Sequence, residues 1–451
     1  MASCGLVPLY RQREFHQSPL WRILVDHAEA FLRTYDSRFA DSHGPLPREA
    51  ERVIDRLVRC GDPRYGLSLL HCPDCRLHMA VPYSCKTRVC PSCVNRRAEV
   101  LAHSLAEKLP EVDYRHLVIT LPKKMGLRKR FQLNPRLQRQ IGRLIHRVLT
   151  RWTAAQIGCH RNRRDQREKA RPGIIMAVQS FGAGLKTHVH YHILITDGIW
   201  FPDGSYYALG HWDQTSLLGQ LRHSILKSLL ARGCLQPETA NLLESWPLER
   251  SGFSAFLGDP INQSGDRPRL QRVLNYILRP ALPLKHLSYV ESTGEVRYSP
   301  PRAAPKVWEH AYDFLADWVQ HIPRARQHQV TYAGHFANAL GNLNPKPEPT
   351  EETDKPKESK PSRWVKWRTL VLRCWAIDPE LCPKCGKQMK RSKALNEQHE
   401  LQRLLKNLGI GLYPVRPRSP PPPSSPPESD DGQFSDCDSQ IPEGWDQWDA
   451  A

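Results

Sequence analysis

The sequence has no apolar run long enough to cross a membrane. No stretch approaches the roughly 18 consecutive apolar residues that a transmembrane helix needs. The first residues, "MASCGLVPLYRQREFHQ", also lack the order of a secretion signal, in which basic residues precede an apolar segment. These absences predict a soluble, cytoplasmic protein with no membrane partner.

The chain is also short of negative charge. It has 46 Asp and Glu against 65 Lys and Arg, which gives a net charge of +19. Such an excess favours a polyanionic partner over a neutral metabolite, and nucleic acid is the first candidate. From Ser419 to Ala451 there are eight acidic residues and no Lys or Arg, so removing these eight charges from +19 leaves +27 on the rest of the chain. The tail and the body therefore have opposite electrostatic roles.

No internal repeat is visible, so 451 residues are expected to form several different modules. The 39 prolines exceed average usage and mark a solvated linker, "PKPEPTEETDKPKESKPS", and a polyproline-like segment, "RPRSPPPPSSPPESDD". The expected divisions are a helical N-terminal region (1–59), a zinc-binding module (60–110), a catalytic domain (111–340), a linker (341–362), a CxxC module (363–412) and a disordered tail (413–451).

Three segments have the composition of strands: "HLVITLPKK" (116–124), "PGIIMAVQSFG" (172–182) and "HVHYHILIT" (188–196). A basic helical stretch separates the first two, which favours an α+β fold with a largely antiparallel sheet. A further helix is expected in "SPLWRILVDHAEAFLRTYDSRFA", where apolar residues recur at helical spacing behind Ser18 and Pro19.

Cysteines cluster in "HCPDCRLHMAVPYSCKTRVCPSCVNRR". Cys72 and Cys75 form one CxxC pair, and Cys90 and Cys93 form another fourteen residues later. This spacing predicts a tetrahedral four-thiolate zinc site, against the alternative of ordinary buried cysteines. Four sulfur ligands leave no open position, so the zinc is expected to be structural.

Other residues compete for places in that site or belong to a second one. Cys60, Cys85 and His71 are spare donors near the first set, and the sequence does not decide which of them substitutes. A second pair, Cys382 and Cys385, has Cys374 upstream and no obvious fourth ligand.

Three histidines alternate along the third expected strand. Because residues two apart in a strand point to the same face, His188, His190 and His192 should project together. Two imidazoles on one face can hold a divalent cation that activates a phosphodiester. Gln179, on the preceding strand, is a candidate third ligand, and the alternative is a set of ordinary core or surface side chains.

A tyrosine lies among arginines in the expected helix "RPRLQRVLNYILRPAL". The helix should begin near Pro268 and end near Arg279, because Pro280 disfavours helix in the residue before it. Its apolar stripe contains Leu270, Val273, Leu274, Ile277 and Leu278; the opposite, basic face contains Arg269, Arg272, Tyr276 and Arg279. Phosphate would bind at such guanidinium groups. Tyr276 is thus either a nucleophile or an interfacial aromatic.

Taken together, these residues resemble the rolling-circle transposases of the HUH (His-hydrophobic-His) endonuclease superfamily, specifically the insertion-sequence-ninety-one family. The matching pieces follow the family order over roughly residues 15–395. They include "HCPDC…SCKTRVCPSC", "HLVITLPK", "VQSFG" with "HVHYHILITDG", "SGFS", "LNYILRPAL", "HIPRARQHQVTYAGHFAN" and "WRTLVLRCWAIDPELCPKCGKQMK".

The resemblance implies an HUH-like antiparallel sheet with flanking helices and assigns roles to its residues. His190 and His192 would be the metal-binding pair, with His188 as a neighbour, and Tyr276 would be the nucleophile. In the two-tyrosine version of the family a second tyrosine stands one helical turn earlier, where this sequence has Arg272, so the resemblance is to the single-tyrosine type. The implied reaction nicks single-stranded DNA through a 5′-phosphotyrosine and rejoins it without ATP.

The implied cofactors are structural Zn²⁺ and catalytic Mg²⁺ or Mn²⁺, and the implied partners are single-stranded DNA of element ends and target, a second subunit and the host replication machinery. The protein would then be bacterial and nucleoid-associated. Residues expected to contact DNA are Lys123, Lys124, Arg88, Arg269, Arg272 and Arg279. The competing hypothesis is a non-catalytic, zinc-containing DNA-binding regulator or an inactivated relic.

Overall fold

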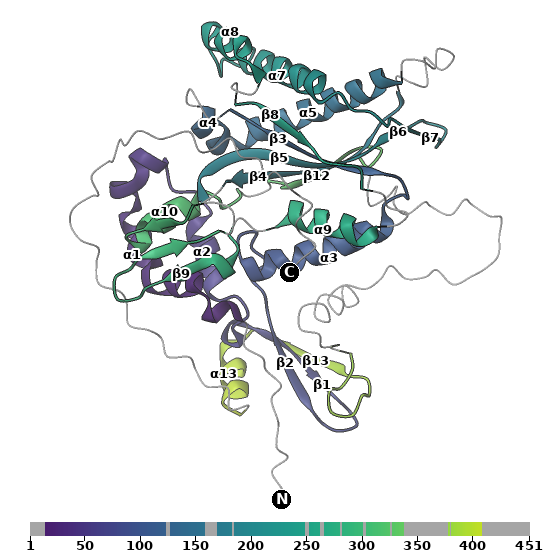
Figure 1. The fold of residues 1–451 in the computed structure, drawn as a ribbon. Helices are drawn as coiled ribbons and strands as arrows, with labels where there is room; N and C mark the ends of the chain where they lie inside the picture. Colours follow the sequence, from purple (N-terminus) through teal and green to yellow (C-terminus); the bar gives the residue numbers. More distant parts are fainter. Residues whose placement is uncertain are drawn as a thin grey trace, which may run out of the picture.

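A five-stranded antiparallel sheet forms the centre of the computed structural model (Figure 1). The structure describes residues 14–122, 127–157, 169–182, 185–248, 252–261, 266–279, 282–300, 304–324, 327–337, 378 and 380–407. The strand order is β12 (Val330–Gly334), β4 (Gly173–Phe181), β5 (Thr187–Thr196), β3 (Tyr114–Thr120) and β8 (Ser254–Leu257). The predicted α+β class with an antiparallel sheet is therefore confirmed, and the histidine-bearing strand β5 is central.

Helices cover both faces of this sheet because its strands bury apolar residues on both sides. Val189, Tyr191 and Ile193 pack in a core shared with helices on one face, namely α4 (Leu127–Leu133), α5 (Pro135–Gln156), α7 (Gln214–Leu230) and α8 (Pro237–Ser245). Leu194 packs on the other face in a core shared with α3 (Pro91–Lys108) and α9 (Arg267–Leu278). Figure 1 shows α5 and α7 above the sheet and α3 and α9 below it.

The N-terminal helices share a core with residues from much later in the chain. Ser18 caps α1 (Pro19–His43) by accepting a hydrogen bond from the Trp21 amide, as the sequence predicts. Following α1 is α2 (Ala50–Val58), and 3₁₀ turns lie at Glu14–Gln17, Pro63–Tyr65 and Leu284–His286. The same core holds residues of a small sheet and one helix: β9 (Leu287–Tyr289), β10 (Val296–Tyr298), β11 (Lys306–Trp308) and α10 (Ala311–Val319). Residues 282–322 thus pack with the N-terminal region rather than only with the sheet.

A small three-stranded sheet joins two segments that are far apart in the sequence. The hairpin of β1 (Leu67–His71) and β2 (His78–Pro82) pairs through β1 with β13 (Lys390–Leu395), in the order β13-β1-β2. The pairing is antiparallel, with Leu67 opposite Leu395, and α13 (Gln398–Asn407) packs beside it. In Figure 1 this sheet extends away from the central one.

The remaining described strands, β6 (Gly198–Trp200) and β7 (Tyr206–Ala208), form a hairpin after β5. Among the helices that the structure describes, none combines the length and apolar character needed to span a bilayer. The predicted linker (341–362), the predicted tail (413–451), Cys374, Lys123 and Lys124 lie outside the described residues.

Candidate functional site

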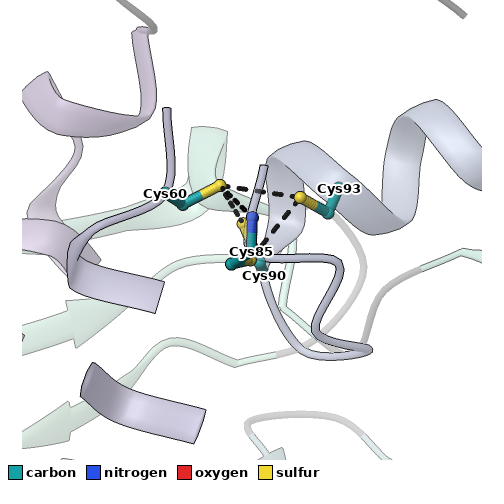
Figure 2. Close-up of side chains that lie close together, drawn as sticks. All are labelled: Cys60, Cys85, Cys90 and Cys93. Atoms are coloured by element: carbon teal, nitrogen blue, oxygen red, sulfur yellow. Dashed lines mark hydrogen bonds between the residues drawn. The ribbon is translucent and has the colours of Figure 1, made fainter. Parts of the chain in front are cut away.

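Four cysteines meet where α3 begins, and they are not the four that the sequence suggested. Cys60, Cys85, Cys90 and Cys93 have ligand atoms that all lie within 4.8 Å of one another (Figure 2). Sulfur separations are 3.6 Å for Cys60–Cys93, 3.5 Å for Cys85–Cys93 and 3.8 Å for Cys60–Cys90. A tetrahedral zinc with Zn–S bonds of about 2.3 Å needs sulfur separations of about 3.8 Å, so this set fits zinc.

Thiol hydrogen bonds make these four cysteines unequal. Hydrogen bonds with Cys85 and Cys90 lower the pKa of the Cys60 thiol, whereas the hydrogen bond with Cys60 raises the pKa of Cys85. The backbone holds the cluster in place: the Cys85 amide donates to the Cys60 sulfur at 3.4 Å, and Arg56 donates to the Cys85 carbonyl at 2.7 Å. Zinc binding would require deprotonation of all four thiols.

The expected set of Cys72, Cys75, Cys90 and Cys93 is therefore wrong as a single site. Cys72 and Cys75 lie instead with Cys382 and Cys385, again with all ligand atoms within 4.8 Å. The physical reason is that the β1–β2 hairpin points away from α3, so its turn lies against the C-terminal CxxC turn. His71 stacks on His78, with ring centroids 6.2 Å apart, and belongs to neither cluster.

The alternating histidines lie on the face of β5 that α9 covers. The rings of His188 and His190 are 5.1 Å apart and those of His190 and His192 are 4.8 Å apart, while Val189 and Tyr191 face the opposite core. His190 and His192 are buried, and His188 is half-buried. One face of one strand thus presents the three imidazoles, as the period of two predicts.

The Nδ1 atoms of both buried histidines are engaged in hydrogen bonds. The Nδ1 atom of His190 lies 2.9 Å from the carbonyl oxygen of His188; because a carbonyl only accepts, Nδ1 carries the proton and Nε2 carries the lone pair. The Nδ1 atom of His192 lies 3.1 Å from Nε2 of His116, and the Nε2 atom of His192 is buried with no hydrogen-bond partner among the described residues. Burial lowers the pKa of His116 to about 4, and burial with nearby His190, His116 and Arg279 lowers that of His192, so both imidazoles are neutral at pH 7.

Gln179 lies directly beside these histidines. It is opposite His190 in the β4–β5 register, and its Nε2 donates to the Ile277 carbonyl of α9 at 3.0 Å. Its Oε1 atom is buried and has no hydrogen-bond partner among the described residues. A buried carbonyl oxygen without a partner in the described part of the chain, beside the imidazoles of His190 and His192, is a donor set suited to a divalent cation.

Tyr276 meets the same histidines from α9. Its ring lies edge-on to His192, with centroids 5.3 Å apart, and 6.0 Å from the ring of His116. The α9 helix spans Arg267–Leu278 with its N-cap at Asp266, so the predicted limits of this helix are confirmed. Leu270, Val273, Leu274 and Ile277 are buried as predicted, and Leu278 is half-buried.

Comparison with known proteins gives a consistent result over most of the chain. Residues 27–121 match the family described as a transposase zinc-binding domain of IS91 type, and residues 173–343 match the family described as a putative transposase. The chain belongs to the IS91 family of transposases. This assignment confirms the family that the sequence motifs indicated.

Two relatives illustrate how divergent this transposase is. It is 21% identical over 365 residues to the transposase for insertion sequence element IS801 of Pseudomonas savastanoi pv. phaseolicola, which covers 76% of this chain and 83% of that protein. It is 27% identical over 176 residues to the putative transposase y4qJ of Sinorhizobium fredii, which covers 39% of this chain and 41% of that protein. No solved structure matches.

The predicted DNA-contact residues of the transposase divide into two groups. Arg272 on α9 and Arg279, which directly follows α9, are exposed, and Arg269 on α9 is half-buried. Arg88 instead donates hydrogen bonds to the carbonyls of Gln327 and Arg324, the latter at 2.7 Å. The Arg88 guanidinium group thus has a structural role within the protein that does not require DNA.

His116 is the site residue that sequence reasoning missed. It lies in β3, where the composition of "HLVITLPKK" predicts a strand and nothing more, and its ring stacks on that of His192 with centroids 5.3 Å apart. The signal would have been the period of two along β3. Val118 lies opposite His192 in the β3–β5 register, and His116, two residues earlier, is on the same face of the strand. Strand order in the sheet, which the sequence does not state, is needed to use it.

Proposed function

We propose that this transposase nicks and rejoins single-stranded DNA by a rolling-circle mechanism, with Tyr276 as nucleophile and a divalent cation at His190, His192 and Gln179. The observation that carries the proposal is the contact of the Tyr276 ring with His192, whose Nε2 atom is buried and without a partner among the described residues. A tyrosine hydroxyl group, two imidazoles and exposed arginines would therefore act together at this place in the fold.

The donor set is compatible with the proposed cation. His190 and His192 would supply Nε2 atoms, since their Nδ1 atoms are engaged with His188 and His116, and Gln179 would supply Oε1. Imidazole nitrogen suits Mn²⁺ and other transition ions, whereas Mg²⁺ prefers oxygen. When bound, the cation would withdraw charge from a nonbridging oxygen of the scissile phosphate.

The side chains of α9 would bind and attack that phosphate. Arg279 donates to the Tyr276 hydroxyl oxygen at 3.3 Å, and its guanidinium carbon lies 4.1 Å from the ring centroid. A phosphate brought to the tyrosine would thus meet a guanidinium that can hydrogen-bond its oxygens. Attack by the Tyr276 oxygen would form a phosphotyrosine ester at the 5′ side, while the 3′ oxygen leaves and takes up a proton.

The reaction is reversible because the phosphotyrosine ester retains the energy of the broken phosphodiester bond. A later 3′-hydroxyl that attacks the phosphotyrosine would release Tyr276 and join two DNA strands. Arg272 stands one turn before Tyr276, so one covalent linkage per subunit is expected at this helix.

The test is covalent capture of DNA. Purified protein is incubated with labelled single-stranded oligonucleotides of its element ends and either Mn²⁺ or Mg²⁺, and adducts are separated on a denaturing gel. We expect an adduct with wild type, and its loss both in Tyr276→Phe and in the His190→Ala/His192→Ala double variant.

Tyr289→Phe is the matched control, because the Tyr289 hydroxyl pairs with His27 at 2.7 Å on α1 and so lies in a different core. This variant should keep the adduct. An adduct that persists in Tyr276→Phe would contradict the assignment of the nucleophile. Tight binding to proven end DNA without any adduct would instead favour the non-catalytic regulator.

A further inference from the structure

We propose that Cys72, Cys75, Cys382 and Cys385 form a second structural zinc site, built from two CxxC turns that lie far apart in the sequence. This site would fasten β13 and α13 onto the β1–β2 hairpin. The residues matched to the transposase zinc-binding domain end at 121, so that domain contains only half of the donors.

The sulfur positions are those of a metal site. The Cys72 and Cys385 sulfurs are 3.5 Å apart, and the Cys75 and Cys382 sulfurs are 3.4 Å apart. These separations are close to the roughly 3.8 Å between sulfurs on a tetrahedral zinc and far from the roughly 2.05 Å of a disulfide bond. The four sulfurs therefore surround a point at which one ion fits.

The two CxxC turns have the same backbone hydrogen bonds. In the first, the Cys72 amide donates to the Leu77 carbonyl at 2.8 Å and the Arg76 amide donates to the Cys72 carbonyl at 3.0 Å. In the second, the Cys382 amide donates to the Lys387 carbonyl and the Gly386 amide donates to the Cys382 carbonyl, each at 2.8 Å. The match is independent of the sulfur distances and indicates two equivalent metal-binding turns.

Both turns also use the left-handed backbone region directly after the second cysteine. Gly386 has φ = 72°, which costs glycine little, but Arg76 has φ = 58°, which is unfavourable for a residue with a Cβ atom. A non-glycine residue held in this conformation implies that the surroundings impose it. Ligation of both cysteines by one ion would supply that constraint.

The small apolar core at this junction explains why a metal is needed there. Its buried members are Leu70, Cys72, Leu77, Met79, Val81, Cys382 and Met389, so two of the seven are cysteines. Small modules with little apolar surface to bury usually depend on metals or disulfides. One salt bridge, Lys387 to Asp74 at 3.0 Å, also joins the two turns, but both side chains are largely exposed and contribute little.

The test measures the number of zinc ions per chain in the full-length protein by elemental mass spectrometry, after loosely bound ions have been removed by dialysis. Wild type should contain two zinc ions per chain, and the Cys382→Ser/Cys385→Ser variant should contain one. Cys234→Ser is the matched control, because Cys234 lies outside both clusters, and it should retain two. One ion in wild type, or two ions in the double variant, would overturn the proposal.

Two further measurements separate a metal site from a merely buried cysteine pair. Cys385→His should keep two zinc ions, because Cys385 is exposed and imidazole is also a zinc ligand. In the double serine variant, hydrogen exchange should accelerate in β13 and remain unchanged in β3. Unchanged exchange in β13 would show that the module docks without the ion.

A different observation carries a second inference, about the opposite side of the central sheet. We infer that the exposed face of α5 binds the phosphate backbone of duplex DNA. Its exposed arginines recur at helical spacing: Arg136, Arg139, Arg143, Arg147 and Arg151. They span about 22 Å of helix at 1.5 Å per residue, and α5 contains no Asp or Glu.

The location of this stripe separates it from the proposed nuclease site. The Tyr191 hydroxyl donates to the Gln138 carbonyl of α5 at 2.7 Å, so α5 covers the face of β5 opposite to His192 and α9. Trp152, the one Phe, Tyr or Trp residue of α5, is buried, so α5 exposes no such ring for base stacking. The exposed charged groups of α5 are a row of guanidiniums on a rigid helix. Such a row suits contact with the phosphates of a duplex.

The experiment measures the salt dependence of binding to a duplex of arbitrary sequence, which does not require nicking to occur. Arg143→Gln/Arg147→Gln should reduce the slope of log K against log salt by about 1.8, at about 0.9 for each phosphate that an arginine no longer neutralises. The matched control, Lys227→Gln/Arg232→Gln on and just after α7, removes the same charge and should leave the slope unchanged. Equal effects of both variants, or weaker binding confined to single-stranded DNA, would overturn the inference.

Discussion

His116 lies directly behind one of the two imidazoles of the proposed cation site. For His192 to offer Nε2 to a cation, its Nδ1 atom must carry the proton, and Nε2 of His116 at 3.1 Å is then the acceptor. Burial keeps His116 neutral by lowering its pKa to about 4, which preserves that acceptor lone pair. His116 is thus a positioning residue for the proposed cation site.

We predict that His116→Leu weakens Mn²⁺ binding by about 10- to 100-fold, because the proton and orientation of His192 are no longer fixed. His116→Gln should restore part of the affinity, since its carbonyl oxygen can accept the same hydrogen bond. Calorimetric Mn²⁺ titration in a Tyr276→Phe background measures this without turnover. Equal Mn²⁺ affinities with and without His116→Leu in this background would contradict the positioning role. If His116→Gln did not recover any Mn²⁺ affinity, direct ligation by His116 would be favoured.

Gln179 allows a second prediction at the same scale. The Nε2 atom of its amide donates to the Ile277 carbonyl of α9, whereas its Oε1 atom would bind the proposed cation. Gln179→Glu keeps an oxygen for the cation but loses the donor to Ile277. We expect Mn²⁺ affinity to be kept or increased while adduct formation falls at least tenfold, as measured by titration and single-turnover nicking. Parallel loss of both would indicate that the side chain has only a structural role.

At the scale of elements, Asp317 joins α10 to β11 and to the end of α1. It accepts hydrogen bonds from Lys306 at 2.7 Å and Trp308 at 2.8 Å, and it lies 3.3 Å from Nε2 of His43. Burial opposes its ionisation, but the hydrogen bonds from His43, Lys306 and Trp308 with the charge of Lys306 outweigh burial and lower its pKa to about 2. The carboxylate therefore stabilises the core that the N-terminal helices share with residues 282–322.

Because the folded pKa is depressed, this stabilisation is fully present above the unfolded pKa of about 4 and is lost as pH falls through 2. Asp317→Asn should lower the stability of this core by about 2 kcal/mol at pH 7. Hydrogen exchange of the α10 amides measures the effect, and the difference from wild type should shrink progressively below pH 4. A difference that stays constant from pH 7 to pH 3 would rule out the carboxylate as its source.

At the scale of the whole molecule, the two cysteine clusters make unequal contributions to the fold. Cys60, Cys85 and Cys90 belong to the large core that contains α1 and α10, whereas the second cluster belongs to a small core at the hairpin. Loss of the first metal should therefore affect the N-terminal region and residues 282–322, and loss of the second only the C-terminal module.

We predict that Cys90→Ser/Cys93→Ser lowers the midpoint of thermal unfolding by more than 10 °C or prevents soluble expression, while Cys382→Ser/Cys385→Ser lowers it by only a few degrees. Scanning calorimetry, with circular dichroism for residual helix, compares the two. Equal destabilisation by both variants would show that the two cores unfold as one unit.

Most of the local structure followed from the sequence alone. Alternation placed the three histidines on one face of a strand, proline positions and apolar spacing set the limits of α9, and Ser18 capped α1. These features depend on residues within a few positions of each other, where backbone geometry fixes which side chains are neighbours. The CxxC pairs likewise identified their cysteines as metal-type donors.

Tertiary structure alone decided which of these local units meet. Pairing of β13 with β1 brings Cys385 to Cys72 across 313 residues, and no spacing rule could have preferred it to the nearer Cys90. Strand order placed His116 beside His192, and the packing of α9 on α3 and β5 placed Tyr276 against them. Such contacts are selected by burial of apolar surface over the whole chain, which is a property of the complete fold and not of any segment.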